Sequence, residues 1–443
     1  MKKITTTIAL LLILSFTLVS ISETGIVKAE PKTIVVPDDY PTISAAVVGA
    51  REGDTIFVKK GTYQEQTLEI NKSLSLIGED VKETILKLDP PLVEIWFFHS
   101  KITVPVTAIT INADNFKLSG FTINMPGGMS AKDEVAMAGG LVAKGDGIEL
   151  VGNRLSSSLQ LSGSLMNITD NEIAGSLIVD GSNQTVANNS IEGSFGSSGS
   201  FNQIIENTID DDDIKLMSSS FNLIIGNSFS TMYMEHSNSN LISGNSFTTL
   251  WIGFYGHACS NNTISANKAT GPGLWGILMG AGSYNVFHDN LISNYMGSHD
   301  GYGIAIGGNH LVAEHNMFYR NILMNNNRNV GTNWEILGAG NFWDNGEVGN
   351  YWDDYTGTDS DGDGIGDVPH IVEGCKWDDA AGGHVEFIFG QDNYPLMEPN
   401  TIPEFTSWII LPLFLMATLF AVIIKKRVPR SKQNRNALAF SSS

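Results

Sequence analysis

Hydrophobic and polar residues alternate with a period of two along much of the chain, and the alternating segments return at a near-constant interval marked by asparagine. The interval is 18 or 20 residues at first and later lengthens to 22, 23 and 26. A period of two is typical of β-strands, and self-similarity at a fixed interval predicts a solenoid whose coils stack on one another. We therefore expect an all-β solenoid. The recurring asparagines are Asn153, Asn171, Asn189, Asn207, Asn227, Asn245, Asn267, Asn290 and Asn316.

A second asparagine column lies five residues upstream of the first, and both columns have a structural explanation. Asparagine tolerates the unusual backbone angles of tight turns, and its amide can bond the same amide in the coils above and below. Such ladders need identical side chains stacked at the strand spacing of about 4.8 Å. We interpret these residues as internal ladders and not as catalytic groups. The second column contains Asn202, Asn222, Asn240, Asn262 and Asn285.

Residues 33–80 predict the opening of the solenoid together with a cap. Strand-like segments flank a short amphipathic helix that begins at Pro41-Thr42 and ends at Ala50. An open solenoid end exposes core side chains and unpaired strand edges. We therefore expect this helix to lie across the end of the solenoid.

Two stretches of the chain resemble a known family. The run TIVVPDDYPTISAAVVGAREGDTIFVKKGTYQEQTLEINKSLSLIGED resembles the first coils of pectin-lyase-like right-handed parallel β-helix proteins, and within them the periplasmic copper-binding NosD family and its archaeal relatives. The run GNYWDDYTGTDSDGDGIGDVPHIVEG is similar to the segment that closes the β-helix in archaeal NosD-like surface proteins. The resemblance implies a single-stranded right-handed parallel β-helix with an N-terminal capping helix. It leaves activity open, because this superfamily hosts lyases, hydrolases, epimerases and non-catalytic binders.

The two ends of the chain predict its location. Residues 1–29 have the basic start, apolar run and small-residue end of a secretory signal peptide. Residues 408–424 are uncharged and precede Lys425-Lys426-Arg427, which predicts one C-terminal transmembrane helix with a cytoplasmic tail. We therefore expect a secreted protein anchored at the cell surface. The expected parts are a β-helix over 30–340, an acidic closing segment over 341–398, a stem over 399–407, the transmembrane helix and a basic tail over 425–443.

The charge of the chain excludes one class of partner. The formal net charge is −21, and residues 30–424 carry 17 basic and 46 acidic residues, a balance of −29. Nucleic-acid binding needs a positive surface, so we expect no nucleic-acid partner. The two thiols, Cys259 and Cys375, could pair outside the cell, but the sequence alone does not decide it.

An acidic, glycine-rich run predicts a calcium loop. Carboxylates at alternating positions let one tight turn direct several oxygens at a hard cation. The position that carries a bidentate Glu in an EF-hand is His370 here, so the loop looks more like the short calcium loops of dockerin-like repeats. We expect a structural calcium ion, and the alternative is an acidic, glycine-rich turn with no fixed ion. Its expected ligands are Asp359, Asp361, Asp363, the carbonyl of Ile365, and Asp367.

The segment Met232-Tyr233-Met234-Glu235-His236 allows two interpretations. Residues i, i+2 and i+4 of a strand share one face, so Met232, Met234 and His236 could offer copper two thioethers and an imidazole. The alternative is that the methionines fill the core, as methionine commonly does. We favour the core and keep copper as a second hypothesis.

If the methionines face the core, Tyr233 points outward, and Trp251 follows at the same phase one coil later. Trp275, displaced by a longer coil, could extend the row. Outward aromatic side chains on a β-helix can stack against sugar rings, so the row is a candidate glycan-binding surface. The alternative is core packing, because Leu159, Leu177 and Phe195 have the same offset from the asparagine and are expected to face inward.

Two sets of residues are candidates for catalysis. Glu192 and Asp210, the first of four consecutive carboxylates, fall at the same phase of adjacent coils and could form the acid pair of a glycosidase. His299 and Asp300 could abstract a proton from a uronic acid, as in β-helix lyases and epimerases. The alternative for the acidic run is a solvated turn.

The combined features favour a non-catalytic β-helix that binds polysaccharide or surface glycan, or serves as a structural rod of the cell envelope. An enzyme acting on acidic polysaccharide is the first alternative. A copper-binding accessory protein, which rests on the family resemblance, is the second.

Overall fold

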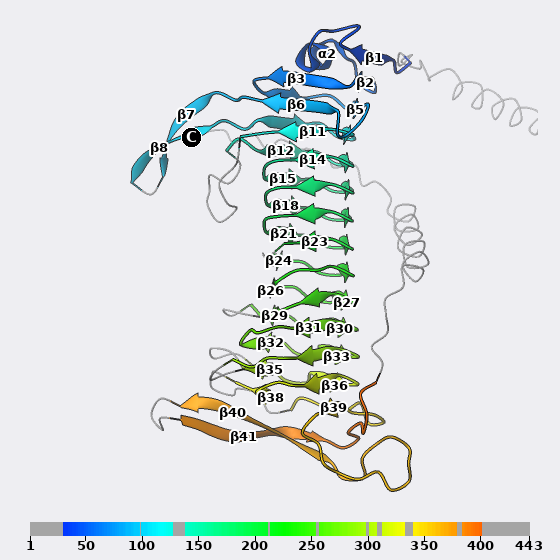
Figure 1. Ribbon diagram of the computed structural model, residues 1–443, viewed down its shortest axis with the longest axis vertical. Coiled ribbons are helices and arrows are strands. Elements are labelled where there is room, and N and C mark those ends of the chain that lie inside the picture. Colours follow the sequence, from blue (N-terminus) through cyan, green and yellow to red (C-terminus); the bar gives the residue numbers. More distant parts are fainter. Residues whose placement is uncertain are drawn as a thin grey trace, which may run out of the picture.

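The chain winds as a parallel β-solenoid whose coils stack along one long axis (Figure 1). Each coil contributes strands to three sheets, which we call A, B and C. The predicted all-β parallel β-helix is confirmed. The computed structural model describes residues 30–97, 99–126, 138–210, 213–253, 257–297, 301–307, 312–332, 340–378 and 383–400.

Sheets A and B form two faces of the solenoid. Sheet B is built in two parts, which Ser228 links by isolated bridges to Thr208 and Ser246. Sheet A contains β1 (Thr33–Val36), β2 (Thr55–Val58), β5 (Ser75–Gly78), β10 (Lys117–Ser119), β13 (Glu149–Val151), β16 (Asn167–Thr169), β19 (Thr185–Ala187), β22 (Gln203–Ile205), β25 (Leu223–Ile225), β27 (Leu241–Ser243), β30 (Thr263–Ser265), β33 (Val286–His288) and β36 (Met317–Tyr319). Sheet B contains β3 (Gly61–Glu65), β6 (Thr84–Leu88), β11 (Thr122–Asn124), β14 (Arg154–Leu155), β17 (Glu172–Ile173), β20 (Ser190–Ile191) and β23 (Thr208–Ile209), then β28 (Ser246–Phe247), β31 (Lys268–Thr270), β34 (Leu291–Ser293), β37 (Ile322–Met324) and β39 (Tyr351–Trp352).

Sheet C is the third face and ends in an antiparallel hairpin, β40–β41. A second hairpin, formed by β7 (Leu92–Phe97) and β8 (Ser100–Pro105), extends from the solenoid near its other end (Figure 1). Sheet C contains β4 (Leu68–Ile70), β9 (Ile109–Asn112), β12 (Leu141–Lys144), β15 (Leu159–Ser162), β18 (Leu177–Asp180), β21 (Phe195–Ser198), β24 (Asp213–Met217), β26 (Thr231–Glu235), β29 (Thr249–Ile252), β32 (Trp275–Met279), β35 (Tyr302–Ile306), β38 (Arg328–Gly331), β40 (His370–Asp378) and β41 (Gly383–Asp392).

The core follows from the alternation in sequence and from an unshifted register. Leu159 pairs with Leu177, and Leu177 with Phe195, so one apolar column continues from coil to coil. These three side chains are at most 1% exposed. The residue after each of them points outward, as the period of two requires.

Helix α2 (Ile43–Gly49) lies at the N-terminal end of the solenoid, where the sequence predicts a cap (Figure 1). The Oγ1 atom of Thr42 accepts a hydrogen bond from the backbone N–H of Ala45 and so caps the helix N-terminus. Ile43, Ala46 and Val47 are the buried residues of the helix, and they cover the first coils.

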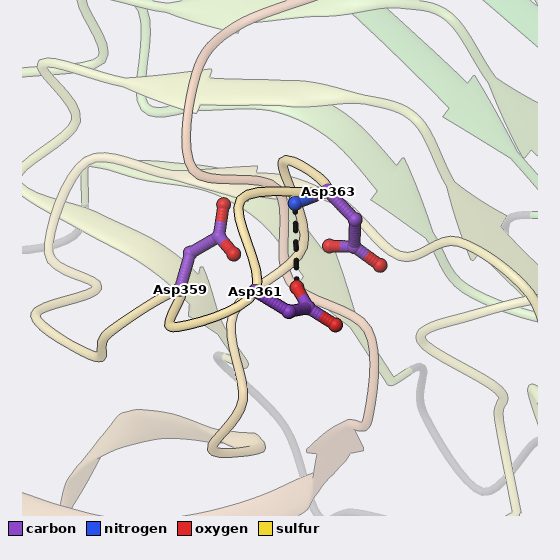
Figure 2. A group of neighbouring side chains, drawn as sticks. All are labelled: Asp359, Asp361 and Asp363. Carbon is purple, nitrogen blue, oxygen red and sulfur yellow. Dashed lines mark hydrogen bonds between the residues drawn. The ribbon is translucent and has the colours of Figure 1, made fainter.

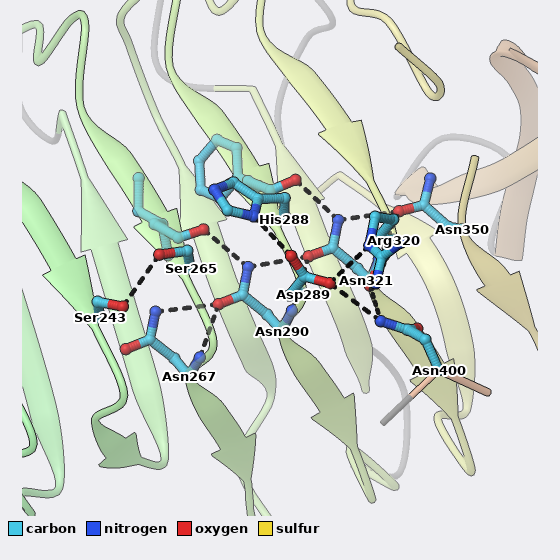
Figure 3. A network of polar contacts seen from close by, with 12 residues as sticks. Ser243, Ser265, Asn267, His288, Asp289, Asn290, Arg320, Asn321, Asn350 and Asn400 are labelled. Atoms are coloured by element: carbon cyan, nitrogen blue, oxygen red, sulfur yellow. Dashed lines mark hydrogen bonds and ion pairs between the residues drawn. The ribbon is translucent and has the colours of Figure 1, made fainter. Parts of the chain in front are cut away.

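The asparagines form two buried ladders along the solenoid. In the rung of Asn227, for example, the backbone N–H and the Nδ2 group donate to the Oδ1 atom of Asn245 in the next coil, and Nδ2 also donates to a backbone carbonyl of the previous coil. The Nδ2 group of Asn202 departs from this pattern and donates to Oγ of Ser197. Figure 3 shows part of the first ladder. That ladder runs through Asn153, Asn171, Asn189, Asn207, Asn227, Asn245, Asn267, Asn290, Asn321 and Asn350.

One predicted rung is corrected. Asn290 donates to Asn321 and not to Asn316, which belongs to the second ladder, where Asn285 donates to it. Both steps span 31 residues, because this coil is longer than the earlier ones. The sequence interval of 26 therefore joined residues of two different ladders.

The first ladder ends at a carboxylate instead of an amide. The Oδ2 atom of Asp392 accepts hydrogen bonds from the backbone N–H of Asn350, at 2.7 Å, and from Nε1 of Trp352, at 2.9 Å. Its Oδ1 atom accepts the backbone N–H of Tyr394 at 3.0 Å. Asp392 is completely buried, and this burial raises its pKa to about 6.

A polar network on the outside of the same coils fastens the end of the described chain. Asp289 accepts from Nε of Arg320 at 2.8 Å and from Nδ2 of Asn400 at 3.1 Å, and Nδ1 of His288 lies 2.8 Å from it (Figure 3). Burial favours a higher pKa for Asp289, but the hydrogen bonds from His288 and Arg320 hold the pKa below its usual value. The carboxylate therefore stays charged and joins residue 400 to the side of the solenoid.

The predicted location requires a correction. Among residues 30–400, as far as the structure describes them, no helix has the length and apolar character to cross a membrane. This finding overturns the prediction of a surface protein held by a C-terminal transmembrane anchor. The segments that carried the prediction, residues 1–29 and 408–443, lie outside the described residues.

Candidate functional site

The outer face of sheet C carries aromatic side chains on neighbouring coils. Met232 and Met234 are at most 1% exposed and face the core, so Tyr233 between them points outward. Tyr233 pairs in register with Trp251. Their ring centroids are 5.1 Å apart, and the ring planes meet at 63°. Both side chains are half-buried, and edge-to-face packing leaves ring faces directed away from the pair.

Trp275 joins the two rings from the next coil. Its ring centroid lies 5.7 Å from that of Trp251, at 67°. The register places Leu278 opposite Trp251, so the longer coil displaces Trp275 to the start of β32. Trp251 and Trp275 both pack against a buried cluster that includes Leu278 and Tyr302. Tyr233, Trp251 and Trp275 therefore form one continuous surface, which we call the aromatic patch.

Charged groups of both signs border the aromatic patch. Lys215 is the register partner of Tyr233 in the preceding coil, and Asp213 lies on the same strand. Burial raises the pKa of Tyr233, and the nearby carboxylate of Asp213 raises it further. Glu235 follows Tyr233 on the same strand and face. The charged residues around the aromatic patch thus offer hydrogen-bond donors and acceptors beside its half-buried rings.

The structure separates the three side chains of the copper hypothesis, Met232, Met234 and His236. The methionines lie inside the core, whereas His236 is exposed. His236 comes after the last residue of β26 and has a φ of +49°. This left-handed conformation turns the side chain away from the face that the strand alternation predicts. His236 instead meets His257 of the next coil, with 2.6 Å between Nε2 of His236 and Nδ1 of His257. Imidazole nitrogens suit copper, so the histidine pair fits this metal while the methionines do not.

Three carboxylates of the predicted calcium loop converge. Asp359, Asp361 and Asp363 place one oxygen each within 4.8 Å of one another (Figure 2). Calcium–oxygen distances of about 2.4 Å place ligands on opposite sides of one ion about 4.8 Å apart, so this spacing fits calcium. The backbone N–H groups of Gly364 and Gly362 hold the pKa of Asp359 below its usual value.

The other two predicted ligands have different positions in the loop. Asp367 is outside the converging group, and its Oδ2 atom accepts the backbone N–H of Ser360. The backbone N–H of Ile365 donates to Asp363 Oδ1, and Ile365 forms an isolated bridge with Leu396. Asp367 and Ile365 therefore hold the shape of the loop and fasten it to the closing segment.

The fold brings one of the two sets of catalytic candidates together. Ser190 and Thr208 pair in register, which places Glu192 and Asp210 at the same phase of adjacent coils, as predicted. Asp213, at the other end of the acidic run, lies on sheet C and pairs with Thr231. Glu192 lines a shallow groove of about 270 Å³ on the outer face of sheet B. The predicted pair His299 and Asp300 lies outside the described residues.

Two features at sheet C were not predicted from the sequence. His257 has no counterpart in the repeat, and only the structure brings it to His236. The cluster of Leu278, Tyr302, Ala305 and Cys375 is fully buried on sheet C, outside the main core. The sequence signal for this cluster is in β35, where the residues from Tyr302 to Ile306 do not alternate between apolar and polar. Cys259 belongs to the main core and Cys375 to the outer cluster, so the two thiols lie in different apolar clusters.

Three parallel sheets, stacked coils and internal asparagine ladders define a parallel β-helix protein. Residues 164–357 match the family described as periplasmic copper-binding protein (NosD), and residues 37–253 match a family described as protein of unknown function (DUF1565). The chain is a NosD-like β-helix protein. The archaeal origin remains a prediction. No curated protein sequence matches the chain.

Solved structures with a similar chain path include proteins of several kinds. A mannuronan C-5 epimerase A-module from Azotobacter vinelandii has 11% identity and a TM-score of 0.43, with 68% of this chain and 92% of that chain covered. A PL6 alginate lyase in complex with a trisaccharide has 11% identity and a TM-score of 0.40, with coverages of 73% and 86%. The Dettilon tailspike protein has 14% identity and a TM-score of 0.42, with coverages of 66% and 67%.

Proposed function

We propose that this protein is a non-catalytic glycan-binding β-helix and that the aromatic patch of sheet C is its sugar-contact surface. The observation that carries the proposal is the arrangement of Tyr233, Trp251 and Trp275 on successive coils, with centroid separations of 5.1 and 5.7 Å. Aromatic side chains supply large rigid contact areas at a low entropic cost. The buried cluster beneath Trp251 and Trp275 holds these rings in place before a ligand arrives.

The charges point to a glycan that is not a polyanion. Asp213 and Glu235 border the patch with Lys215 as the basic neighbour, and the sequence from residue 30 to 424 carries a balance of −29. A polyuronate would be repelled by this field. A neutral polysaccharide has apolar ring faces for the aromatic patch and hydroxyl groups for Asp213, Lys215 and Glu235.

Replacing Trp251 with alanine is expected to weaken glycan binding about 30-fold, or about 2 kcal/mol, because central buried aromatic residues dominate binding surfaces. A screen of immobilised neutral and acidic glycans identifies the ligand. Calorimetric titration of that ligand then gives the dissociation constants of the native chain and of the Trp251→Ala and Tyr233→Ala variants.

Phe201→Ala is the matched control for this experiment. Phe201 and Phe221 are 57% and 56% exposed, but their rings are nearly parallel, with 9° between planes and 5.3 Å between centroids. Each ring covers one face of the other, and the pair lies in the turns that follow β21 and β24, outside the aromatic patch. Glycan affinity should not change in this variant. Equal losses for Phe201→Ala and Trp251→Ala, or a preference for polyuronates, would contradict the proposal.

We also propose a structural calcium ion at Asp359, Asp361 and Asp363. With a dissociation constant near 0.3 mM, within the range of extracellular calcium loops, 10 mM calcium would stabilise the folded state by about 2 kcal/mol. Calorimetric titration of calcium should therefore show one weak site that Asp361→Asn removes. Asn keeps the oxygen that accepts the backbone N–H of Asp363. Asp170→Asn, at an exposed left-handed turn residue, is the control, and an unchanged titration in Asp361→Asn would reject the site.

A further inference from the structure

Two histidines of successive coils bring their rings together at the edge of sheet C. Nε2 of His236 lies 2.6 Å from Nδ1 of His257, and the ring centroids are 4.2 Å apart at 62°. The carboxylate of Glu235 is the third group, with Oε2 at 3.9 Å from Nε2 of His257. Two imidazoles therefore meet directly, and the carboxylate lies beside the other ring nitrogen of His257.

The backbone around the pair is fixed by hydrogen bonds between the two coils. The Oγ atom of Ser237, next to His236, donates to the carbonyl of Glu235 at 2.8 Å. The N–H of Ser237 donates to Sγ of Cys259 at 3.4 Å. The backbone N–H of Ser260 donates to Oδ1 of Asn238 at 2.7 Å. The two turns are thus joined on the side of the core, so little ordering is needed when the imidazoles bind a common partner.

The separation of the nitrogens restricts what they can bind. At 2.6 Å both nitrogens cannot carry a proton, so they share either one proton or one cation. Metal–nitrogen distances of about 2.0–2.1 Å place two imidazole ligands about 3 Å apart. The observed N–N separation is shorter than this value by a few tenths of an ångström, so the two rings would move apart and rotate to bind the ion. Carboxylate oxygen and imidazole nitrogen together suit the later divalent transition metals.

Solvent and charge are also compatible with a bound ion. His236 is exposed, and the side chains of His257 and Glu235 are 37% and 31% exposed. Water can therefore reach the site and complete the coordination. The negative balance of the chain favours cations, and Glu235 is the charged group that lies against the pair.

We propose that His236 and His257, with Glu235 beside them, bind one divalent transition-metal ion of the copper, nickel and zinc class. The site differs from the methionine-containing set expected from the sequence, and it differs from the hard oxygen site at Asp359. It shares Glu235 with the border of the aromatic patch, but neither imidazole belongs to that patch. The bound ion links two successive coils through their side chains.

Copper(II) is the probe for this site, and the full chain is used without a histidine tag. Millimolar calcium is present throughout to occupy the Asp359 loop. Calorimetric titration should give one copper ion per chain, and the electron paramagnetic resonance spectrum should show nitrogen couplings from two imidazoles. His236→Asn and His257→Gln should each weaken binding by at least about 10-fold. Each variant should retain the couplings of one imidazole at most.

His315→Asn is the matched control, because His315 is also exposed and has a φ of +57°, close to the +49° of His236. Asparagine tolerates this left-handed conformation, so both asparagine variants should fold, which circular dichroism checks. Copper affinity and the two-imidazole spectrum should be unchanged in His315→Asn. Equal copper binding by the native chain and a His236→Asn/His257→Gln double variant would overturn the proposal. A spectrum without nitrogen couplings would overturn it as well.

Discussion

Asn245→Ala should lower the free energy of unfolding by about 4 kcal/mol, because several buried polar groups lose their partners at once. Nδ2 of Asn245 donates to the carbonyl of Ile224 and to Oδ1 of Asn267. Its Oδ1 atom accepts both the backbone N–H and the Nδ2 group of Asn227. Alanine supplies neither function, and the rung is 1% exposed, so water does not easily replace it.

Urea unfolding followed by circular dichroism measures this loss. Asn167→Ala is the control, since Asn167 lies on the outer side of sheet A and is partly exposed. A surface change of this kind should alter stability by about 0.5 kcal/mol or less. If the two alanine variants lost equal stability, the ladder would not be a principal source of stability in this fold.

Asp392 should make the protein less stable as the pH rises from about 4 to about 6. Its folded-state pKa is raised by burial to about 6, from the ordinary 3.8, despite donors from Asn350, Trp352 and Tyr394. The folded state therefore holds a proton that the unfolded state releases in this window. At 1.36 kcal/mol per unit, the change is about 3 kcal/mol, fully present below pH 4 and lost above pH 6.

A difference measurement separates Asp392 from neighbouring groups that titrate in the opposite sense. Burial lowers the pKa of His370, which stacks on Trp352. The folded protein therefore loses the stability contributed by neutral His370 as the pH falls below 6.5. Asp289 and Asp359 have pKa values below the ordinary 3.8, so their contribution to the stability of the folded state is lost only when the pH falls below 3.8. Stability should therefore be compared between the native chain and Asp392→Asn at pH 4.5 and pH 7. A difference that stays constant with pH would show that Asp392 is charged throughout.

Much of the fold could be predicted because strand alternation and repeat interval are local properties of the sequence. The alternation, together with apolar residues at the same phase in the next coil, favoured Met232 and Met234 in the core, and Tyr233 would then point outward. The equal phase of Tyr233 and Trp251 then placed their rings next to each other. The same rule fails where a strand ends: His236 has a left-handed backbone, and its side chain no longer follows the alternation.

The remaining features depend on contacts that have no fixed interval. His257 follows a coil of altered length, so its phase could not be counted from His236. Asp392 lies 42 residues after Asn350, and it ends a ladder of amides with a different chemical group. Asn316 shows the same difficulty, because a long coil moved it from one predicted column to the other. Each of these positions is set by coil length, and the sequence pattern does not report the path of an extended turn.

The ladders also affect how the number of coils can change during evolution. Each amide is bonded to the amides directly before and after it, so any coil presents the same connectors at both of its faces. Duplicating or losing a complete 18-residue unit, such as the one between Asn171 and Asn189, would leave every remaining connector matched. Evolution could in this way lengthen or shorten the rod by about 4.8 Å at a time. The distance between helix α2 and the aromatic patch would then change in fixed steps, while the structures of both stay the same.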